Sequence, residues 1–354
     1  MRIFRNKMYR LAMSPLAALY GSAVRARNVL YDRGLLAQHR VGAKVISIGN
    51  ISVGGTGKTP VTMAVAQLLL EHGCRPAVLS RGYGRQGSGI VLVSRGDGPL
   101  CSVSESGDEP YVLAEKLRGV PVCVAGDRVA GARHLIETCS PQVIVLDDGF
   151  QHRRLHRDLD IVLVDTGDFF ANNRVLPAGL YREPASSLAR ADLVLVTDRE
   201  TGADVDIAAF AGEAALHGPA ALIAGVSFVH TELFYPGTGK TGPLTSLIGE
   251  TVLPVCGLAR PEQFAETLRR AGAVPAQPVF FRDHVHYTER ELAEITRGFY
   301  RSGASWLVTT RKDWVKLAQL RLPEDIPVAV LEMRAKLSEQ AQSFVLRWLQ
   351  REVL

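Results

Sequence analysis

The chain has 354 residues, enough for about two domains, and its 47% hydrophobic and 22% charged residues are typical of a globular protein, which argues against a disordered, collagen-like or coiled-coil chain. Its five cysteines are scattered and include no C-x-x-C pair, which argues against a disulfide framework or a zinc site and fits a reducing compartment. The net charge of +5 is uneven, because residues 1–50 carry nine Lys/Arg and one acid, a balance of +8, whereas the rest of the chain totals −3.

The first predicted element is a basic and apolar segment over residues 1–35. Its apolar stretch, Leu11–Val24, has 14 residues, fewer than the ~20 that a helix needs to span a bilayer. A signal peptide opens in a similar way, but here Arg25 follows the small residues directly and a nucleotide-binding motif comes soon after. Basic flanks with Leu and Tyr on one face favour an amphipathic helix on an anionic membrane surface. A basic helix packed on the protein's own body is the alternative, and interleaved aromatic residues are too few to favour nucleic acid.

The strongest local motif is S-V-G-G-T-G-K-T-P at residues 52–60. The apolar run Val45–Ile48 predicts a buried strand before it, and a helix is predicted from Thr59 onward. The glycines between them let backbone N–H groups face a phosphate chain, while Lys58 would reach the β- and γ-phosphates and the Thr59 hydroxyl would bind Mg²⁺. Ser52 stands where the strict G-x-x-x-x-G-K-[ST] pattern has glycine, and a glycine-rich turn before a core helix is the alternative. The predicted ATP-binding loop comprises Ser52, Val53, Gly54, Gly55, Thr56, Gly57, Lys58 and Thr59.

A second apolar run, Val143–Leu146, ends in two acids, Asp147 and Asp148. A P-loop enzyme holds its metal with a carboxylate at the end of a neighbouring buried strand. One of these aspartates can bind Mg²⁺, directly or through water, while the other fixes the geometry of the loop. The sequence leaves open which aspartate does which.

Short apolar strands alternate with helical patterns along residues 36–215. This rhythm predicts an α/β domain of the P-loop NTPase type, with a mostly parallel sheet and helices on both faces. Ligands gather at the carboxyl ends of such strands. Two polar clusters follow predicted strand ends there, S-R-G-Y-G-R at residues 80–85 and G-D-R at residues 126–128.

Two further polar segments of this domain are ambiguous. G-D-E-P at residues 107–110 places Asp108 ahead of a helix, where it serves either as an N-cap or as a carboxylate that orients a base or the attacking hydroxyl. L-P-A-G-L-Y-R-E-P at residues 176–184 presents Arg182, which either neutralises a transferring phosphoryl group or forms a surface ion pair.

The composition changes after residue 215. Residues 216–250 are predicted to be linker strands, and residues 251–354 a smaller α/β domain whose closing helix has an apolar core face. D-H-V-H-Y at residues 283–287 follows a predicted strand, where a neutral imidazole either takes a proton from a hydroxyl or is a bystander. T-T-R-K-D-W-V-K at residues 309–316 reads as a strand end and a helix start, with no role that the sequence identifies.

The motifs S-V-G-G-T-G-K-T-P, S-R-G-Y-G-R, G-D-E-P, D-D-G-F-Q-H, L-P-A-G-L-Y-R-E-P and D-H-x-H-Y occur in this order, and together they resemble the tetraacyldisaccharide 4′-kinases, the lipid A 4′-kinases of Gram-negative bacteria. The resemblance covers nearly the whole chain, and family members share the position equivalent to Ser52. It implies ATP- and Mg²⁺-dependent phosphorylation of the 4′-hydroxyl of a tetraacyldisaccharide 1-phosphate, which yields lipid IVA. It also implies a peripheral or monotopic enzyme at the cytoplasmic face of the bacterial inner membrane, without an obligate protein partner.

The resemblance further implies roles for individual residues. His284 would remove the hydroxyl proton and Asp108 would orient the imidazole, with Lys58 as a third catalytic residue; His284 matches the family motif better than His286 does. The metal would be held by Thr59, Asp147, Asp148 and Glu183, and ATP by the loop and by Gln151. Residues near the substrate or the transferring phosphate would be Arg81, Tyr83, Glu109, Arg128 and Arg182.

Two other functions remain possible from the sequence. A switch-type P-loop NTPase or a membrane-recruited chaperone would respond to a protein partner, although the chain has no clear N-K-x-D motif of GTPases. A soluble kinase or ligase with a water-soluble acceptor would leave the N-terminal segment unexplained. With a base in one domain and a P-loop in the other, a kinase would couple turnover to domain closure.

Overall fold

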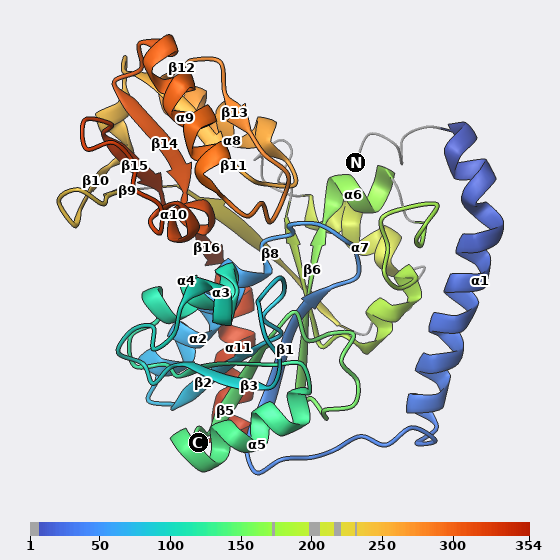
Figure 1. Cartoon of the computed structure of the whole chain (residues 1–354). Coiled ribbons are helices and arrows are strands. Elements are labelled where there is room, and N and C mark those ends of the chain that lie inside the picture. Colours follow the sequence, from blue (N-terminus) through green and yellow to red (C-terminus); the bar gives the residue numbers. More distant parts are fainter. Residues whose placement is uncertain (1–6, 172–173, 198–205, 216–220, 231) are drawn as a thin grey trace.

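A computed structural model describes residues 7–171, 174–197, 206–215, 221–230 and 232–354. The chain forms a large domain around a nine-stranded sheet and a smaller domain around a seven-stranded sheet, with one long helix lying beside the large domain (Figure 1). The basic residues Arg2 and Arg5 of the N-terminal segment lie outside the described residues.

The large sheet has the strand order β16-β8-β7-β6-β1-β5-β2-β4-β3. Its interior pairs are all parallel, and only the two edge strands, β16 and β3, run antiparallel to their neighbours. The parallel order brings the carboxyl ends of the inner strands to one edge. The strands are β1 (Lys44–Asn50), β2 (Pro76–Ser80), β3 (Ile90–Ser94), β4 (Val122–Ala125), β5 (Val143–Asp147), β6 (Leu159–Asp165), β7 (Leu193–Thr197), β8 (Leu222–Val229) and β16 (Arg334–Leu337).

Helices cover both faces of this sheet, which confirms the fold class that the sequence predicts. The inner strands are buried on both faces because successive side chains point to opposite sides. In β1, Ile46 and Ile48 enter the core on one face, and Val45 enters the core on the other. The first face carries α2 (Lys58–Glu71), α4 (Asp108–Lys116) and α11 (Glu339–Glu352), with the short α3 (Val103–Ser106) beside α4; the second carries α5 (Arg128–Cys139), α6 (Thr166–Ala171), α7 (Ile207–Ala215) and the 3₁₀ helix η2 (Ala185–Arg190).

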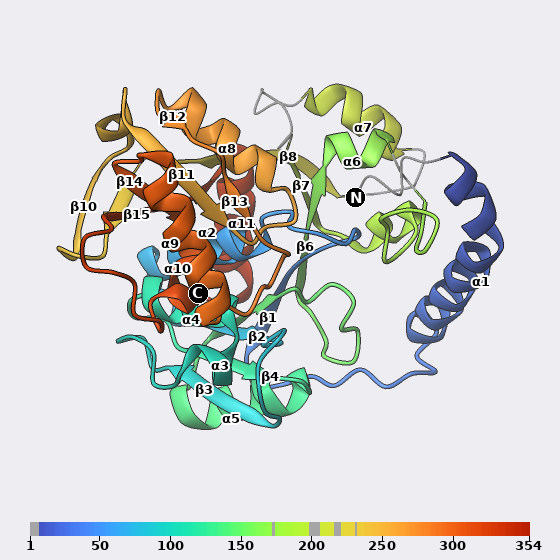
Figure 2. The same ribbon diagram turned by 45° about the horizontal axis from the view of Figure 1, so that its top comes forward.

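The smaller domain has the strand order β10-β9-β15-β14-β11-β12, and β13 also pairs with β11. Two cores flank this sheet, one under α8 and the other under α9 and α10. Figures 1 and 2 show that this domain lies next to the large sheet, on the side of its strand ends. Its elements are β9 (Glu232–Tyr235), β10 (Lys240–Pro243), η3 (Leu244–Leu247), β11 (Thr251–Cys256), α8 (Pro261–Arg270), β12 (Val274–Pro275), β13 (Val279–Phe280), α9 (Glu289–Ser302), β14 (Trp306–Thr310), α10 (Arg311–Leu317) and β15 (Val328–Leu331).

The end of the chain does not stay in the smaller domain, which differs from the division predicted at residue 251. Strand β16 pairs with β8 in the large sheet, and Ala341, Val345 and Trp348 of α11 enter the same core as α2. The predicted linker is divided too, because β8 belongs to the large sheet and β9 to the small one. A helical apolar period identifies a buried face but not the core that this face enters, so the sequence could not place the closing helix.

The long helix beside the large domain is α1 (Lys7–Asp32), drawn in blue in Figures 1 and 2. Its apolar stretch is split between two surroundings. Ala17 and Gly21 are buried, whereas Met8, Leu11, Leu16 and Leu19 are exposed. Among the helices of the described residues, none is long and apolar enough to cross a membrane.

Candidate active site

A cavity of about 2260 Å³ lies between the two domains at the carboxyl ends of the large sheet. The smaller domain closes it with residues of α8, α10 and the loop before α9. The predicted site residues that line this cavity are Val53, Gly54, Gly55, Thr56, Gly57, Lys58, Thr59, Arg81, Tyr83, Glu109, Asp147, Asp148, Arg182 and His284.

The loop between β1 and α2 has the conformation that phosphate binding requires. Gly54 and Gly57 have φ values of 109° and 92°, in the region that only glycine adopts readily. Helix α2 begins at Lys58, and no side chain caps its first N–H groups. A helix N-terminus of this kind attracts an anion, since its N–H groups and dipole both favour negative charge.

Neighbouring segments hold this loop in place. The Val53 N–H donates to the Leu180 carbonyl at 2.7 Å, Ser52 forms a bridge with Tyr181, and the Asn50 amide donates to the Thr56 hydroxyl at 2.8 Å. Ser52 itself is buried beneath the loop. The backbone of the loop is therefore fixed before any phosphate arrives.

Asp147 and Asp148 stand next to each other but in opposite electrostatic surroundings. Thr62 and Ser80 donate to Asp147 at 3.0 and 3.4 Å, while burial, Glu109 and Asp148 raise the pKa of Asp147. Burial also acts to raise the pKa of Asp148, but Lys58 and Arg182 outweigh it and hold that pKa below its usual range.

The two carboxylates also differ in their partners and backbone. Asp148 lies 3.6 Å from the Lys58 ammonium and 3.0 Å from the Arg182 guanidinium, and its φ of 56° turns the chain sharply after the strand. Among the described residues no cation is in contact with Asp147, so Asp147 is the carboxylate whose negative charge a bound cation would most stabilise.

The metal-binding residues that the sequence predicts fit a magnesium site only in part. The Thr59 hydroxyl, which donates to Glu109 at 3.3 Å, and Asp147 lie on the same cavity. Within the described ranges no three His, Cys, Asp or Glu side chains converge on one point. Mg²⁺ bound to a nucleotide usually takes one or two protein oxygens together with phosphates and water.

Glu183 lies away from these groups. Its buried carboxylate pairs with Arg190 at 2.9 Å and accepts from the Asn28 amide at 2.9 Å. Burial would raise the pKa of Glu183, but Arg190 and Asn28 outweigh it and lower that pKa. Glu183 is not among the residues that line the cavity, so its contacts describe a structural carboxylate beneath the loop and do not support the predicted metal ligand.

Asp108 and His284 meet across the domain boundary, as the resemblance implies. Asp108 Oδ2 lies 3.2 Å from His284 Nδ1, and the Tyr83 ring packs edge-on against the imidazole at 5.0 Å. Asp108 is not the N-cap of α4, because Gly107 takes that position and the Asp108 carboxylate accepts from the next backbone N–H. His286 is exposed and is not among the residues that line the cavity.

Cations surround this carboxylate. Burial acts to raise the pKa of Asp108, but the hydrogen bond with His284 and the charges of Lys312 and Lys316 outweigh it and lower that pKa. Lys316 lies 3.4 Å from Asp108, and Lys312 lies 3.4 Å from Glu109. Asp108 is therefore ionised at neutral pH.

These two lysines are site residues to which the sequence analysis gave no role. Both belong to α10, in the T-x-R-K-D region, where they stand four residues apart on the same helix face. Asp313, between them in the sequence, accepts from Tyr287 and Thr310 and so anchors the helix. The only signal in the sequence was a pair of lysines at helical spacing directly after a strand.

Arg128 and Gln151 lie behind the cavity wall. Arg128 donates to the carbonyls of Ala125 and Gly126, and burial together with the charge of Arg81 lowers the pKa of Arg128 to about 10. Gln151 donates to the Asn50 carbonyl at 2.9 Å and accepts from Arg182 at 3.4 Å. Gln151 therefore connects the end of β1 to Arg182, and Arg128 holds the turn between β4 and α5.

Helix α1 contacts these same loops from the outside. The Tyr20 hydroxyl donates to the Arg182 carbonyl at 2.8 Å, and Arg27 donates to the Gln151 carbonyl at 2.8 Å. A third contact of this helix is the hydrogen bond from the Asn28 amide to Glu183. The helix thus braces the loop that presents Arg182 to the cavity.

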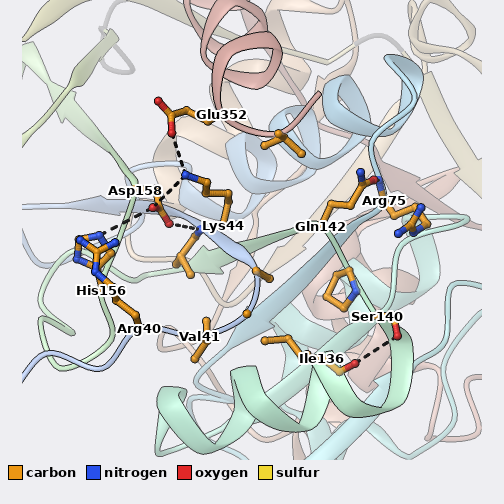
Figure 3. Close-up of a pocket in the computed structure, with 15 residues that line it drawn as sticks. Arg40, Val41, Lys44, Arg75, Ile136, Ser140, Gln142, His156, Asp158 and Glu352 are labelled. Carbon is orange, nitrogen blue, oxygen red and sulfur yellow. Dashed lines mark hydrogen bonds and ion pairs between the residues drawn. The ribbon is translucent and has the colours of Figure 1, made fainter.

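A second pocket, of about 580 Å³, lies at the opposite edge of the large sheet (Figure 3). Most of its lining residues lie at or just before strand starts, others belong to the ends of α5 and α11, and none belongs to the predicted site. Lys44 at its centre is held by Glu352 at 2.8 Å and Asp158 at 3.7 Å. Its contacts attach the C-terminal helix to β1.

The fold and the cavity together define a P-loop phosphotransferase, with a phosphate-binding loop and strand-end carboxylates on one side and a carboxylate–imidazole pair on the other. The family model described as Tetraacyldisaccharide-1-P 4'-kinase matches residues 9–350, and the chain belongs to this family.

Individual relatives agree with this assignment. The chain is 37% identical over 335 residues to the tetraacyldisaccharide 4'-kinase of Desulfotalea psychrophila, with 94% of each chain covered. It is 42% identical over 330 residues to that of Geobacter metallireducens, covering 92% of this chain and 94% of the relative. A solved structure of LpxK from Aquifex aeolicus in complex with ATP matches with a TM-score of 0.78 and 32% identity, covering 96% of this chain and 98% of that one. The resemblance seen in the sequence is thereby confirmed.

Proposed function

We propose that this chain carries out the reaction of its family, the ATP-dependent transfer of a γ-phosphate to the 4′-hydroxyl of a tetraacyldisaccharide 1-phosphate, which gives lipid IVA in lipid A biosynthesis. The observation that supports it most is the contact between Asp108 and His284, from different domains, because His284 lines the cavity that the P-loop also lines. A nucleotide and an acceptor hydroxyl can therefore share one cavity.

The large domain would hold the nucleotide. The N-terminus of α2 and the loop ending at Gly57 would bind the phosphate chain, with Lys58 and Arg182 neutralising its charge. Thr59 and Asp147 would hold Mg²⁺, which, when bound, neutralises phosphate charge and so favours attack on phosphorus. Asp148 keeps Lys58 and Arg182 aimed into the cavity.

The proton would leave through the pair at the domain boundary. Asp108 holds Nδ1 of His284, and the Nε2 lone pair accepts the 4′-hydroxyl proton as the oxygen bonds to the γ-phosphorus. The bond from that phosphorus to the bridging oxygen breaks, and ADP leaves. The charge of Asp108 stabilises the imidazolium that forms. Tyr83 and Arg81, which line the same cavity, would contact the acceptor.

A lipid acceptor also explains the exposed face of α1. Its exposed apolar side chains, with basic residues along the same helix, suit the surface of an anionic membrane. We place the protein as a peripheral enzyme at the cytoplasmic face of the inner membrane, where ATP is available.

Transfer of labelled γ-phosphate from ATP to a tetraacyldisaccharide 1-phosphate in detergent micelles tests this proposal. We expect Mg²⁺-dependent labelled lipid from the wild type, and losses of at least ~100-fold in Lys58→Ala and His284→Ala. His286→Ala is the matched control, because its side chain is exposed two residues from the base. Release of free phosphate without labelled lipid would overturn the acceptor and favour a switch-type NTPase.

A further inference from the structure

The ammonium of Lys312 lies in direct contact with the nitrogen that must accept the proton. Its Nζ is 3.1 Å from His284 Nε2, 3.2 Å from Asp283 Oδ1 and 3.4 Å from Glu109 Oε1. The lysine side chain is 18% exposed, so it is largely shielded from water. Three donors thus face three acceptors, one of which is the proposed base.

This contact fixes the tautomer of His284. An ammonium group has three donors and no lone pair, so it can only donate to Nε2. Nε2 must then carry the lone pair, and the ring proton of the neutral imidazole must lie on Nδ1, from which it is donated to Asp108 at 3.2 Å. That is the form in which Nε2 can remove a proton from a hydroxyl.

The same contact opposes protonation of the ring. An imidazolium would direct an Nε2–H at the Lys312 ammonium, placing two positive charges 3.1 Å apart with no acceptor between them. Asp108 opposes this effect, because a carboxylate at Nδ1 favours the imidazolium. The other charged or titratable groups around the ring are Glu109 and Asp108 of α4, Lys316 of α10, Asp283 of its own loop and Tyr83 of the loop after β2.

We propose that Lys312 is a positioning residue for His284, which keeps the imidazole neutral and its Nε2 lone pair directed into the cavity until the acceptor hydroxyl takes the place of the ammonium. This inference rests on the proposed function, since it assigns a role within that reaction. Asp283 and Glu109 would keep hold of Lys312 when the hydroxyl displaces it.

Glu109 connects this arrangement to the P-loop. One of its carboxylate oxygens accepts from the Thr59 hydroxyl at 3.3 Å, and the other faces Lys312. The position of Lys312 therefore depends on a side chain that also contacts the proposed metal-binding threonine. The base and the phosphate site are joined by a continuous series of polar contacts.

The first test is nuclear magnetic resonance of ¹⁵N-histidine-labelled full-length protein, with the His284 signal identified by its loss in His284→Ala. We expect wild-type His284 to be the Nδ1–H tautomer at pH 8. In Lys312→Met, the midpoint pH at which the neutral imidazole becomes an imidazolium should rise by about one unit. That is the change expected when a neighbouring unit positive charge is removed at a high effective dielectric constant. An Nε2–H tautomer in the wild type, or the same midpoint in Lys312→Met, would overturn the proposal.

The second test is the pH profile of kcat/KM for phosphate transfer to the lipid acceptor. The acidic limb of Lys312→Met should move upward by about one pH unit, a roughly tenfold loss at acidic pH. Lys312→Arg keeps a donor-only cation and should retain the wild-type limb, and Lys240→Met, on the exposed strand β10, serves as the charge-matched control. A uniform loss of kcat/KM at every pH would show a merely structural role and refute the proposal. If the wild type does not phosphorylate the lipid, the proposed function fails, and the tautomer measurement still decides the role of Lys312.

Discussion

Gly57 offers a sharp test of how the phosphate-binding loop is held. A Cβ built at this glycine would lie 2.1 Å from Cζ and 2.5 Å from Cε1 of the Phe228 ring, and the residue has a φ of 92°. Gly57→Ala therefore has two separate free-energy costs, one for the left-handed backbone and one for the overlap with the Phe228 ring. Phe228 belongs to β8, so the substitution also reports on the contact between the loop and that strand.

The expected size of the effect follows from these two costs. A non-glycine residue in the left-handed region raises the free energy of the folded state by about 1–2 kcal/mol. Moving the ring of Phe228 adds an overpacking cost of about 1–3 kcal/mol. Gly57→Ala should therefore lower the free energy of unfolding of the large domain by about 2–5 kcal/mol, and it should weaken ATP binding because the loop can no longer keep its shape.

Gly55→Ala is the matched control within the same loop. A Cβ at Gly55 would meet no atom within 4 Å, and its backbone is outside the left-handed region. We expect a change within about 0.5 kcal/mol. Urea unfolding followed by intrinsic fluorescence, with and without ATP, measures both variants.

A double-mutant cycle with Phe228→Ala separates the two costs. In Gly57→Ala/Phe228→Ala the ring is gone, so only the backbone cost should remain, and the two substitutions should be non-additive by about 1–3 kcal/mol. Equal stabilities of Gly57→Ala and Gly55→Ala would refute the reasoning. Additive effects in the cycle would show that Phe228 does not press on the loop.

Three further predictions concern other parts of the molecule. Glu183→Ala should lower the free energy of unfolding by about 3–5 kcal/mol, because Arg190 is left buried without its partner, and urea midpoints equal to the wild type would contradict this. The pKa of Asp108 is lowered on folding, so the ionised carboxylate stabilises the folded protein above the pKa of about 4 that it has in the unfolded chain, and this stabilisation is lost as the pH falls. The difference in Tm between wild type and Asp108→Asn should therefore shrink from pH 6 to pH 3. A constant difference would argue against the ion pairs. Leu11 and Leu19 are each 70% exposed, so Leu11→Gln/Leu19→Gln should reduce binding to anionic phospholipid vesicles at least ~10-fold in sedimentation assays, whereas unchanged binding would show that another surface contacts the membrane.

The local parts of the site could be predicted from the sequence because each is encoded within a few residues. The loop at residues 52–59 needs glycines followed by Lys and Thr, and Asp147 and Asp148 end an apolar run that favours a buried strand. The resemblance to a known family supplied the pairing of Asp108 with His284, which are 176 positions apart. The structure brings that pair to 3.2 Å.

The remaining parts depend on contacts between distant segments. The sequence shows lysines at helical spacing in residues 309–316, but only the packing of α10 against α4 reveals that they face carboxylates. Glu183 follows Arg182 directly, yet the two side chains point to different partners, and its pairing with Arg190 depends on the short helix η2. The apolar face of α11 was evident, whereas the sheet that it covers was not.

The charged contacts between the domains give the proposed base its geometry. Three carboxylates of α4, those of Asp108, Glu109 and Glu115, each face a cation of α10. Lys116 of α4 reverses the charges, because it is the cation and faces the carboxylate of Glu332. The partly exposed pairs among them, such as Lys312–Glu109, contribute only about 0–1 kcal/mol each, whereas Asp108 and Lys316 are largely buried. An apolar cluster of Val103, Val112 and Val315, with Tyr111 packed against it, lies between the same helices.

Two of these contacts also orient the reacting groups, because Lys316 holds Asp108 and Lys312 holds Glu109 and His284. The contacts that join the domains are therefore the same contacts that direct Nε2 of His284 toward the phosphate site. An arrangement of the domains that separates α4 from α10 would remove the base from Asp108 and from the P-loop together. We therefore expect phosphate transfer only in the joined arrangement, because separated domains would lack a base next to the P-loop.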